Sequence, residues 1–547
     1  MTDNIIENAV KVLPAAHFEK AGNELIAKLK SRRDLLFQFS NEYYNFVNKY
    51  LDIFCTDKED SVFVNRINDL NTEVKVFSKE KKSSAGYGIL YYHKIFSNEI
   101  TKDIRIHLLD GDDKTFVTGD VEESPVVRFI GGEGKDEFED SSIVNGYFLT
   151  FTPIPAAENR TRFYDSGNNT IFKTGPSSFV NRDEVPKPAN QIEMYEPALR
   201  DRGHHWRLIP VLSFDSDNGL IFGLSPFVKK HNFRADPFEY KMSFTVMYAT
   251  FPKSTSFGFS GEFPQYIKNA IVKLDAELTE LRFTKYFGYG NNTVFSKALY
   301  NDDFYKLDQE LFFVKPSVEF YLSEKIKSNL GVSYNYWESK LSNKILINNF
   351  PYENSGLGNI KVIGLHSEFE YNSLDNQNEP AEGFQINSKL TYYPKVWQVD
   401  RSFVKGSFDA KTYFTTNSFS NVTLALRAGA AKIWGHYPFF EGVFLGGPDN
   451  LRGYNRDRFA GDAYLFGKAE LRTYLTEVKI ILKGKLGFHL FGESGRVFAQ
   501  GEDSNKWHPS YGGGLWLSYL NSELVGAAYI AGSPEGLQFY LNVGFGF

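Results

Sequence analysis

The sequence predicts a mainly β protein: a sixteen-stranded antiparallel transmembrane β-barrel preceded by a small α+β region. Three observations predict it. Residues 206–547 contain segments of about 9–14 residues in which apolar and polar side chains alternate, divided by polar turns. Segments of this length can cross about 25–30 Å of hydrocarbon when they tilt. The chain also combines 16% aromatic residues with a mean hydropathy of −0.35, as expected when alternating residues divide between lipid and a wet lumen.

A soluble β-sandwich would also show alternating strands, with the polar face in water. Two features favour the membrane barrel. The strands exceed the usual length of about five or six residues. Aromatic residues suited to the two membrane interfaces stand at strand ends, as at Tyr392, Tyr393, Phe439 and Phe440.

Composition excludes several other classes. The 547 residues carry a net charge of −6, which argues against nucleic acid as a partner. The single cysteine, Cys55, excludes an internal disulfide framework and a cysteine-based zinc site. We find no run of about 18 apolar residues that would form a membrane helix, and residues 1–30 show no signal-peptide pattern.

Four regions are expected along the chain. Residues 1–50 have apolar residues at three- and four-residue spacings and are predicted to be helical, with Pro14 dividing two helices. Residues 51–140 contain short β-like runs between Asn, Asp and Gly turns and are predicted to form a β-rich domain. Residues 141–205, rich in proline, are predicted to be an irregular connector with a few strands, and the barrel occupies 206–547.

The last predicted strand shows the clearest alternation. One face carries six large apolar residues, which we expect to face lipid: Leu537, Phe539, Leu541, Val543, Phe545 and Phe547. The glycines at 544 and 546 leave the other face with little side-chain packing.

A long loop between two predicted strands is the strongest candidate for a functional element. Residues 437–461 include a stretch with four glycines and three arginines, centred on Arg452, Gly453 and Tyr454. An arginine inside a barrel needs an acidic partner on an inward face. Glu493 has the same strand parity as His489 and is therefore expected in the lumen, where a buried pair with Arg452 would fix the loop's geometry.

These segments resemble the BamA–TamA–FhaC superfamily of outer-membrane assembly and secretion barrels, the surface-antigen family. Leu451-Arg-Gly-Tyr454 is similar to the family's signature loop, and the segment 491–497, which includes Gly495, is similar to its partner strand motif, with Glu493 in place of the usual Asp. Further similarity lies at 287–291, 375–383, 469–472 and 511–515, although Leu374 stands where Arg is usual. The resemblance implies that the loop folds into the lumen with Arg452 against Glu493.

The resemblance also implies a role for the barrel seam. Phe545 and Phe547 resemble the C-terminal signal by which outer-membrane barrels are recognised for insertion. The last strand would meet the first one, which starts at Trp206, and in the family this junction is the proposed lateral gate, where a client strand can add by β-augmentation. An ordinary closed seam is the alternative.

Residues before the barrel carry a second resemblance. Residues 104–113, 130–132 and 200–203 are similar to the segment that links a metallophosphoesterase to a surface-antigen barrel in some Bacteroidetes proteins. The sequence has no Asp-x-His, Gly-Asp-x-x-Asp or Gly-Asn-His run to bind two metal ions, and no Gly-x-Ser-x-Gly motif. We therefore expect no enzymatic activity.

A calcium-binding pattern occurs in the same half of the chain. Residues 131–138 fit the nonapeptide repeat GGxGxDx, with Asp136, and residues 111–116 form a partial copy with Asp112 and Asp113. Calcium needs six or more oxygen ligands from adjacent turns. The two interpretations are a Ca²⁺ site at these aspartates and ordinary Gly-Asp turns between strands; no other cofactor is expected.

With the resemblance to the surface-antigen family, the leading expectation is an outer-membrane barrel that helps to insert or translocate outer-membrane proteins, with its N-terminal region in the periplasm. Its expected partners are the lipid bilayer, unfolded outer-membrane protein clients and other subunits of an assembly machine, since the usual periplasmic repeats are not recognisable. The alternative is a passive structural barrel or plugged pore. A soluble enzyme is the third and least favoured class.

Overall fold

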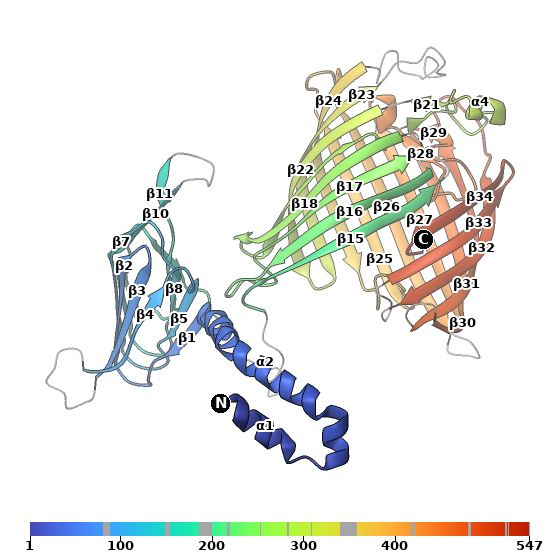
Figure 1. Ribbon diagram of the computed structural model, residues 1–547. Coiled ribbons are helices and arrows are strands. Elements are labelled where there is room, and N and C mark those ends of the chain that lie inside the picture. The colour runs from blue at the N-terminus through green and yellow to red at the C-terminus, as the bar shows by residue number, and fades with distance from the viewer. Residues whose placement is uncertain are drawn as a thin grey trace. The chain divides into compact units, whose positions relative to one another are not determined.

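The structure, a computed structural model, divides into two compact units, Met1–Glu196 and Pro197–Phe547 (Figure 1). It describes residues 1–79, 88–147, 154–184, 200–215, 219–251, 253–281, 284–307, 309–339, 358–416, 422–479, 483–519, 522, 524–545 and 547.

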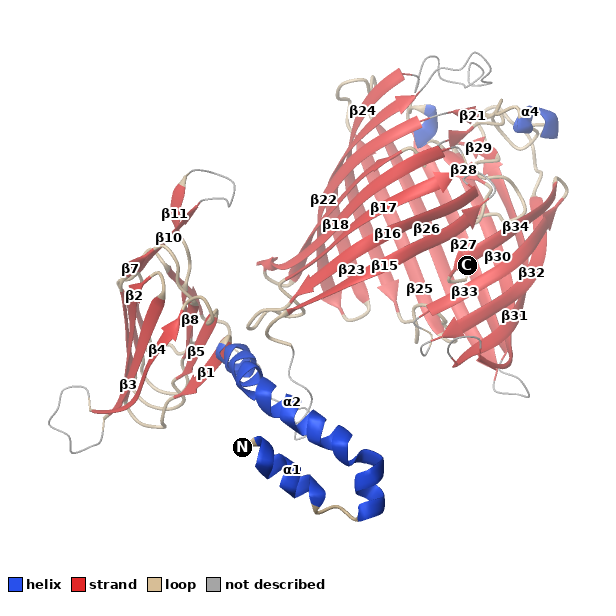
Figure 2. Ribbon diagram, in the orientation of Figure 1, coloured by secondary structure: helices blue, strands red, loops and turns tan. Residues whose placement is uncertain are grey.

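The first unit begins with two helices, α1 (Asp3–Lys11) and α2 (Ala15–Asn48), shown in blue in Figure 2. Pro14 precedes α2 in an extended conformation, as expected of a residue that cannot continue a helix. Ile6 and Val10 are the buried residues of α1, and Lys30 of α2 forms ion pairs with Asp3 at 3.1 Å and with Glu7 at 2.6 Å. The two helices therefore form a hairpin. Within the described residues, no helix has the length and apolar character needed to cross a membrane.

After the helices, the chain coils between two sheets that face each other. The first sheet has five parallel strands: β1 (Tyr50–Phe54), β5 (Asp103–His107), β8 (Val126–Ile130), β12 (Thr161–Tyr164) and β14 (Ser178–Asn181). The second has six strands: β4 (Ile89–Ser97), β3 (Asn71–Ser78), β2 (Asp60–Asn68), β6 (Lys114–Thr118), β9 (Glu137–Asp140) and β13 (Ile171–Lys173). Because β2, β6, β9 and β13 are also parallel, the arrangement is a β-solenoid.

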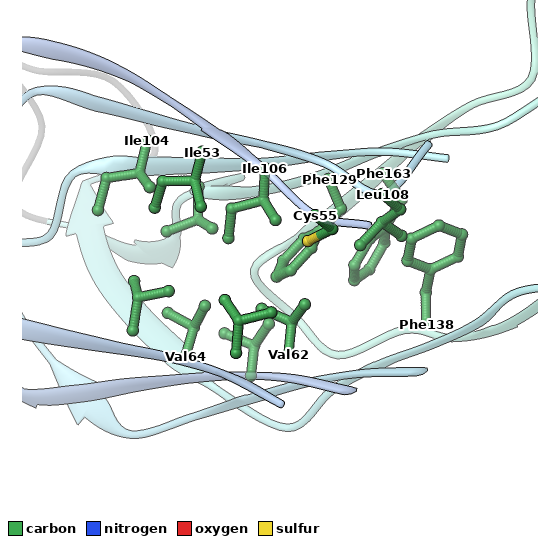
Figure 3. Close-up of a cluster of buried hydrophobic side chains, with 14 of the residues drawn as sticks. Ile53, Cys55, Val62, Val64, Ile104, Ile106, Leu108, Phe129, Phe138 and Phe163 are labelled. Atoms are coloured by element: carbon green, nitrogen blue, oxygen red, sulfur yellow. The ribbon is translucent and has the colours of Figure 1, made fainter. Parts of the chain in front are cut away.

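The solenoid core lies between the two sheets. Each short strand places alternate apolar side chains inward, where they meet those of the opposite sheet (Figure 3): Ile53, Cys55, Val62, Val64, Ile104, Ile106, Leu108, Phe129, Phe138 and Phe163. Cys55 is buried among them as a small apolar residue.

The solenoid extends into the region for which the sequence predicts an irregular connector. Strands β12, β13 and β14 within residues 161–181 complete the two sheets. A separate small sheet contains β7 (Asp120–Val121), β10 (Ile143–Tyr147) and β11 (Pro155–Ala157). Strands this short, paired with strands distant in sequence, leave no periodic pattern of apolar residues. The expectation of an irregular connector with a few strands therefore did not identify their place in the two sheets.

The second unit confirms the predicted fold class. Sixteen antiparallel strands form the barrel, in sequence order: β15 (His204–Asp215), β16 (Gly219–Lys230), β17 (Tyr240–Thr250), β18 (Lys253–Ile267), β19 (Ala270–Thr279), β22 (Gln309–Ser323), β23 (Ile326–Ser339), β24 (Gly358–Asn372), β25 (Gly383–Tyr393), β26 (Phe403–Thr416), β27 (Val422–Trp434), β30 (Ala463–Lys479), β31 (Lys483–Phe498), β32 (His508–Tyr519), β33 (Leu524–Ser533) and β34 (Gly536–Val543).

The two faces of the barrel wall differ as the alternation predicts. Apolar side chains such as Leu208 and Phe539 are exposed on the outside. Inward side chains form ion pairs, for example Lys315 with Glu368 at 2.7 Å and Lys273 with Glu319 at 2.6 Å. The wall thus combines a lipid-facing surface with a polar lumen.

Shorter elements lie in the connections between barrel strands. They are β20 (Thr284–Lys285), α4 (Lys297–Asn301), β21 (Lys306–Leu307), the 3₁₀ turn η2 (Phe439–Glu441), β28 (Val443–Leu445) and β29 (Phe459–Gly461). Strands β20 and β21 pair with each other, and so do β28 and β29.

Candidate functional site: the lumen loop and the barrel seam

The loop between β27 and β30 lies against the inner wall of the barrel. Strands β28 and β29 form its base. Beyond this base, Leu451 and Tyr454 are buried in a cluster that includes Phe466 and Val497 of the wall strands β30 and β31. The loop therefore has an apolar anchor of its own, in addition to its charged contacts.

Arg452 at the tip of the loop is completely buried, with 0% of its surface exposed. Its Nε donates to Oε1 of Glu493, and its backbone N–H donates to Oε2 of the same carboxylate at 2.8 Å. A second carboxylate, that of Glu470 on β30, accepts from Nη2 at 3.1 Å. The guanidinium also stacks 3.5 Å from the ring centroid of Phe491. The structure thus brings together the predicted pair and adds Glu470, which the sequence reasoning did not identify as a partner.

The pair belongs to a larger buried cluster of charges. Lys468 Nζ lies 3.6 Å from Glu493, and Glu470 also contacts Arg472 at 2.8 Å and His489 Nδ1 at 3.2 Å. Lys468, Glu470 and Arg472 alternate along β30 and so share its inner face, which is the sequence signal that could have identified this cluster. Each carboxylate meets more than one cation, an arrangement that fixes orientation more than it adds stability.

The neighbours of Arg452 connect the loop to the wall at other points. The N–H of Gly453 donates to Oη of Tyr540 at 3.1 Å, and Oη of Tyr454 donates to the carbonyl of Pro509 at 3.1 Å. At Gly495, a Cβ atom would lie 2.9 Å from a methyl group of Leu445 in the loop base, so this glycine permits close packing of loop and wall.

The seam lies between the first and last strands of the barrel. Among the described residues, β15 and β34 are paired at Phe214 and Leu541. Strand β15 pairs with β16 along all twelve of its residues, from His204 to Asp215. Pro210, in the middle of β15, has no N–H to donate, which is typical of strands at sheet edges.

The end of the chain bends into the barrel, contrary to one expectation from the sequence. Phe545 and Phe547 were expected on the lipid face with Leu537, which is 76% exposed. Instead, both rings stack on the guanidinium of Arg472 inside the barrel, at 3.8 and 5.3 Å. The cause is Gly544, whose φ of +83° ends the strand and reverses the side on which the following residues lie.

This bend leaves a cavity of about 650 Å³ at the seam. Its lining combines residues of β15, of the end of the chain, of the loop and of the inner wall: Pro210, Val211, Leu212, Ser213, Asn542, Phe545, Phe547, Pro448, Asp449, Lys411 and Arg427. Trp206, nearer the start of β15, is 69% exposed and lies on the same face of the strand as Leu208 and Leu212. The seam and the lumen loop thus border one shared space.

The aspartates of the predicted calcium pattern stabilise stacked turns of the solenoid. Oδ1 of Asp113 accepts the N–H of Asp60 at 2.7 Å, Oδ1 of Asp136 accepts that of Asp113 at 3.0 Å, and Oδ1 of Asp112 accepts that of Lys135 at 2.8 Å. In the described part of the chain, no group of three or more His, Cys, Asp or Glu side chains is placed to hold a metal ion.

The glycines of this pattern have a separate structural reason. A Cβ atom on Gly132 would lie 1.4 Å from the carbonyl oxygen of Leu109, and one on Gly134 would lie 1.8 Å from that of Gly111. Glycine is needed because the turns 108–113 and 131–136 stack backbone to backbone. Burial raises the pKa of the Asp113 carboxyl to about 8, and it also raises that of Asp136.

Fold and site define a sixteen-stranded β-barrel with a loop folded into its lumen and a seam between its first and last strands. The Omp85 superfamily domain matches residues 238–519, and the chain belongs to this superfamily. Its members are generally transport and assembly barrels without enzymatic activity, which agrees with the expectation that this chain is not an enzyme. The match does not extend into the first unit, so the similarity to phosphoesterase–barrel fusions stays a prediction.

The chain is also similar to several solved structures. BamA from Haemophilus ducreyi lacking POTRA domains 1–3 is 14% identical, with a TM-score of 0.45 over 63% of this chain and 70% of that one. CdiB from Acinetobacter baumannii is 12% identical (TM-score 0.39; 63% and 66% covered), as is CdiB from Escherichia coli (0.43; 63% and 62%). No curated protein matches the sequence.

Proposed function

We propose that this protein inserts or translocates other outer-membrane proteins through its β15–β34 seam. The observation that carries the proposal is the seam itself, which is paired at Phe214 and Leu541 and is bordered by a cavity that reaches the lumen. Backbone N–H and C=O groups along an unpaired strand edge bind another strand by β-augmentation. The edge of β15 would accept a strand of an unfolded client in this way.

The first unit is then periplasmic, because it leads into the first barrel strand and buries an apolar core between its own two sheets. In this proposal the first unit takes the position that periplasmic repeats have in other assembly barrels. Partner subunits supply the remaining parts of the assembly machine. Affinity purification from outer membranes tests this part. Recovery of assembly components or of an unfolded barrel client supports it, whereas recovery of the chain without either contradicts it.

A disulfide across the seam tests the proposed gate. Ser213 and Asn542 lie next to Phe214 and Leu541, the pair described on the two strands, and both line the cavity. We expect the oxidised variant Ser213→Cys/Asn542→Cys, reconstituted in vesicles, to lose the ability to fold an added barrel client, measured as protease-protected client. Reduction should restore it.

The two single-cysteine variants are the matched controls, because they carry the same substitutions without the cross-link. The native Cys55 is buried in the other unit's core and stays in place. Full activity of the oxidised double variant would refute the gate and favour the passive, plugged pore.

A further inference from the structure

A second buried arginine of the lumen loop, Arg458, binds the turn of the last hairpin. This residue is 1% exposed. Its Nε donates to both carboxylate oxygens of Glu535, at 2.8 and 2.9 Å, and Nη2 lies 2.7 Å from Oε1. Glu535 stands in the tight turn between β33 and β34. This multidentate contact has the geometry that gives arginine–carboxylate pairs their orientational specificity.

The remaining bonds of Arg458 extend the contact to the loop between β19 and β22. Nη1 donates to Oγ1 of Thr293 at 2.6 Å, and Nη2 donates to the carbonyl of the same residue at 2.8 Å. The guanidinium also lies 4.6 Å from the ring centroid of Phe459. One side chain thus joins three parts of the barrel that are far apart in sequence.

Other bonds connect the loop to the same hairpin. Oγ of Ser533 donates to the carbonyl of Gly453 at 2.7 Å, and the Gly453 N–H donates to Tyr540. Nε2 of Gln538 donates to Oδ1 of Asn455 at 3.4 Å. The loop therefore holds β33 and β34 along their inner face as well as at their turn.

The opposite side of the seam is held differently. There, the cavity described above lies between residues 210–213 of β15 and Pro448 and Asp449 of the loop. Strand β15 is bonded along its length to β16. The loop thus restrains the last hairpin of the barrel by direct hydrogen bonds, whereas it faces residues 210–213 of β15 across the cavity, which Asn542, Phe545 and Phe547 also line.

We infer that Arg458 and Glu535 form a lock that makes the last hairpin the fixed side of the seam, so that the seam opens by movement of the β15–β16 hairpin. Arg458 is in this sense a positioning residue, distinct from Arg452, whose carboxylate partners lie on β30 and β31. The inference rests on the proposed function for its biological meaning, but the motion that it describes exists without any client.

Hydrogen–deuterium exchange of the full chain in lipid nanodiscs tests the lock without an activity assay. In the unaltered protein, we expect faster amide exchange along β15 than along β34. In Glu535→Gln, exchange in β33 and β34 should accelerate by roughly tenfold or more, because Arg458 is left buried without its countercharge. Exchange in β15 and β16 should change much less.

Arg458→Gln should give the same pattern, and it keeps a side chain that can still donate to Thr293. Arg496→Gln is the matched control, since Arg496 lies on β31 and bonds to the carbonyl of Ser504 away from the hairpin; exchange in β33 and β34 should then stay as in the unaltered protein. Unchanged exchange of β33 and β34 in both lock variants would overturn the inference, as would equal acceleration on both sides of the seam. Neither outcome depends on whether the protein assembles clients.

Discussion

Replacing Arg452 by alanine is the most direct test of the lumen loop. The substitution removes the guanidinium that binds Glu493 and Glu470, together with its stacking on Phe491. It leaves two carboxylates in a space from which water is excluded, since both side chains have 0% of their surface exposed. Lys468 still lies 3.6 Å from Glu493.

The expected cost is about 3–5 kcal/mol, the range for removing one partner of a buried ion pair. Glu470 keeps its contacts with Arg472 and His489, and Lys468 partly neutralises Glu493. The loss in the free energy of unfolding is therefore expected at the lower end of this range. Loss of the cation–π contact adds up to about 2 kcal/mol, but this contribution is not independent of the first.

Urea unfolding of the barrel in lipid vesicles, followed by tryptophan fluorescence, measures this difference in the free energy of unfolding. Limited proteolysis of residues 446–458 reports in parallel whether the loop has left the wall. Lys483→Ala is the control, since Lys483 on β31 forms a solvent-exposed pair with Glu477 and its removal should leave stability essentially unchanged. An Arg452→Ala protein with unaltered stability and a protected loop would refute the reasoning.

Three further predictions concern other parts of the chain. Glu493→Asp keeps the carboxylate and shortens it by one methylene, so its loss of stability in the same urea assay should be smaller than that of Arg452→Ala; an equal loss would contradict this. Gly544→Ala places an L-residue at φ +83°, at a cost of about 1–2 kcal/mol, and should loosen the inward bend. The readout is a change in Trp516 fluorescence, because the ring of Phe545 lies 5.6 Å from that indole; an unchanged spectrum would contradict it. The raised pKa of Asp113, about 8 against an ordinary 3.8, means that the folded solenoid holds this proton more tightly than the unfolded chain does. Its stabilising effect is therefore full below about pH 4 and is lost as the pH rises through about 8. Thermal unfolding of the first unit, followed by proteolysis at several pH values, should show this dependence weakened in Asp113→Asn, and an identical dependence in both proteins would contradict it.

Much of the barrel could be predicted because the alternation of apolar and polar residues within each strand shows which side faces lipid and which side faces the lumen. Leu537 and Phe539 alternate with polar residues, and this pattern persists wherever lipid covers one side of the wall. The same rule failed at Phe545 and Phe547. Alternation assumes a continuous strand, and Gly544 ends the strand before these rings are reached.

The lumen pair could be predicted from charge and parity, but its full set of partners could not. Glu493 was placed in the lumen by strand parity, whereas Glu470 is close to Arg452 only through the pairing of β30 with β31. The contact of Arg458 with Glu535 joins residues 77 positions apart at the barrel seam. Contacts of this kind depend on closure of the whole barrel and leave no local pattern.

The solenoid of the first unit was the largest structural element that sequence reasoning missed. Most of its parallel strands have three to five residues and are too short for periodicity to reveal their partners. One signal was present: Asp113 and Asp136 close turns that are each six residues long and are 23 positions apart. Interpreted as a repeat of the fold, that spacing would have predicted stacked coils.

The stacking of equal turns has a consequence for how this unit can vary in length. Residues 108–130 form one complete coil, from the start of one six-residue turn to the start of the next. Removing or duplicating such a coil would preserve every parallel pairing on either side and would change the height of the stack by one strand spacing, about 4.8 Å. The length of this unit can therefore change by whole coils without redesign of its core.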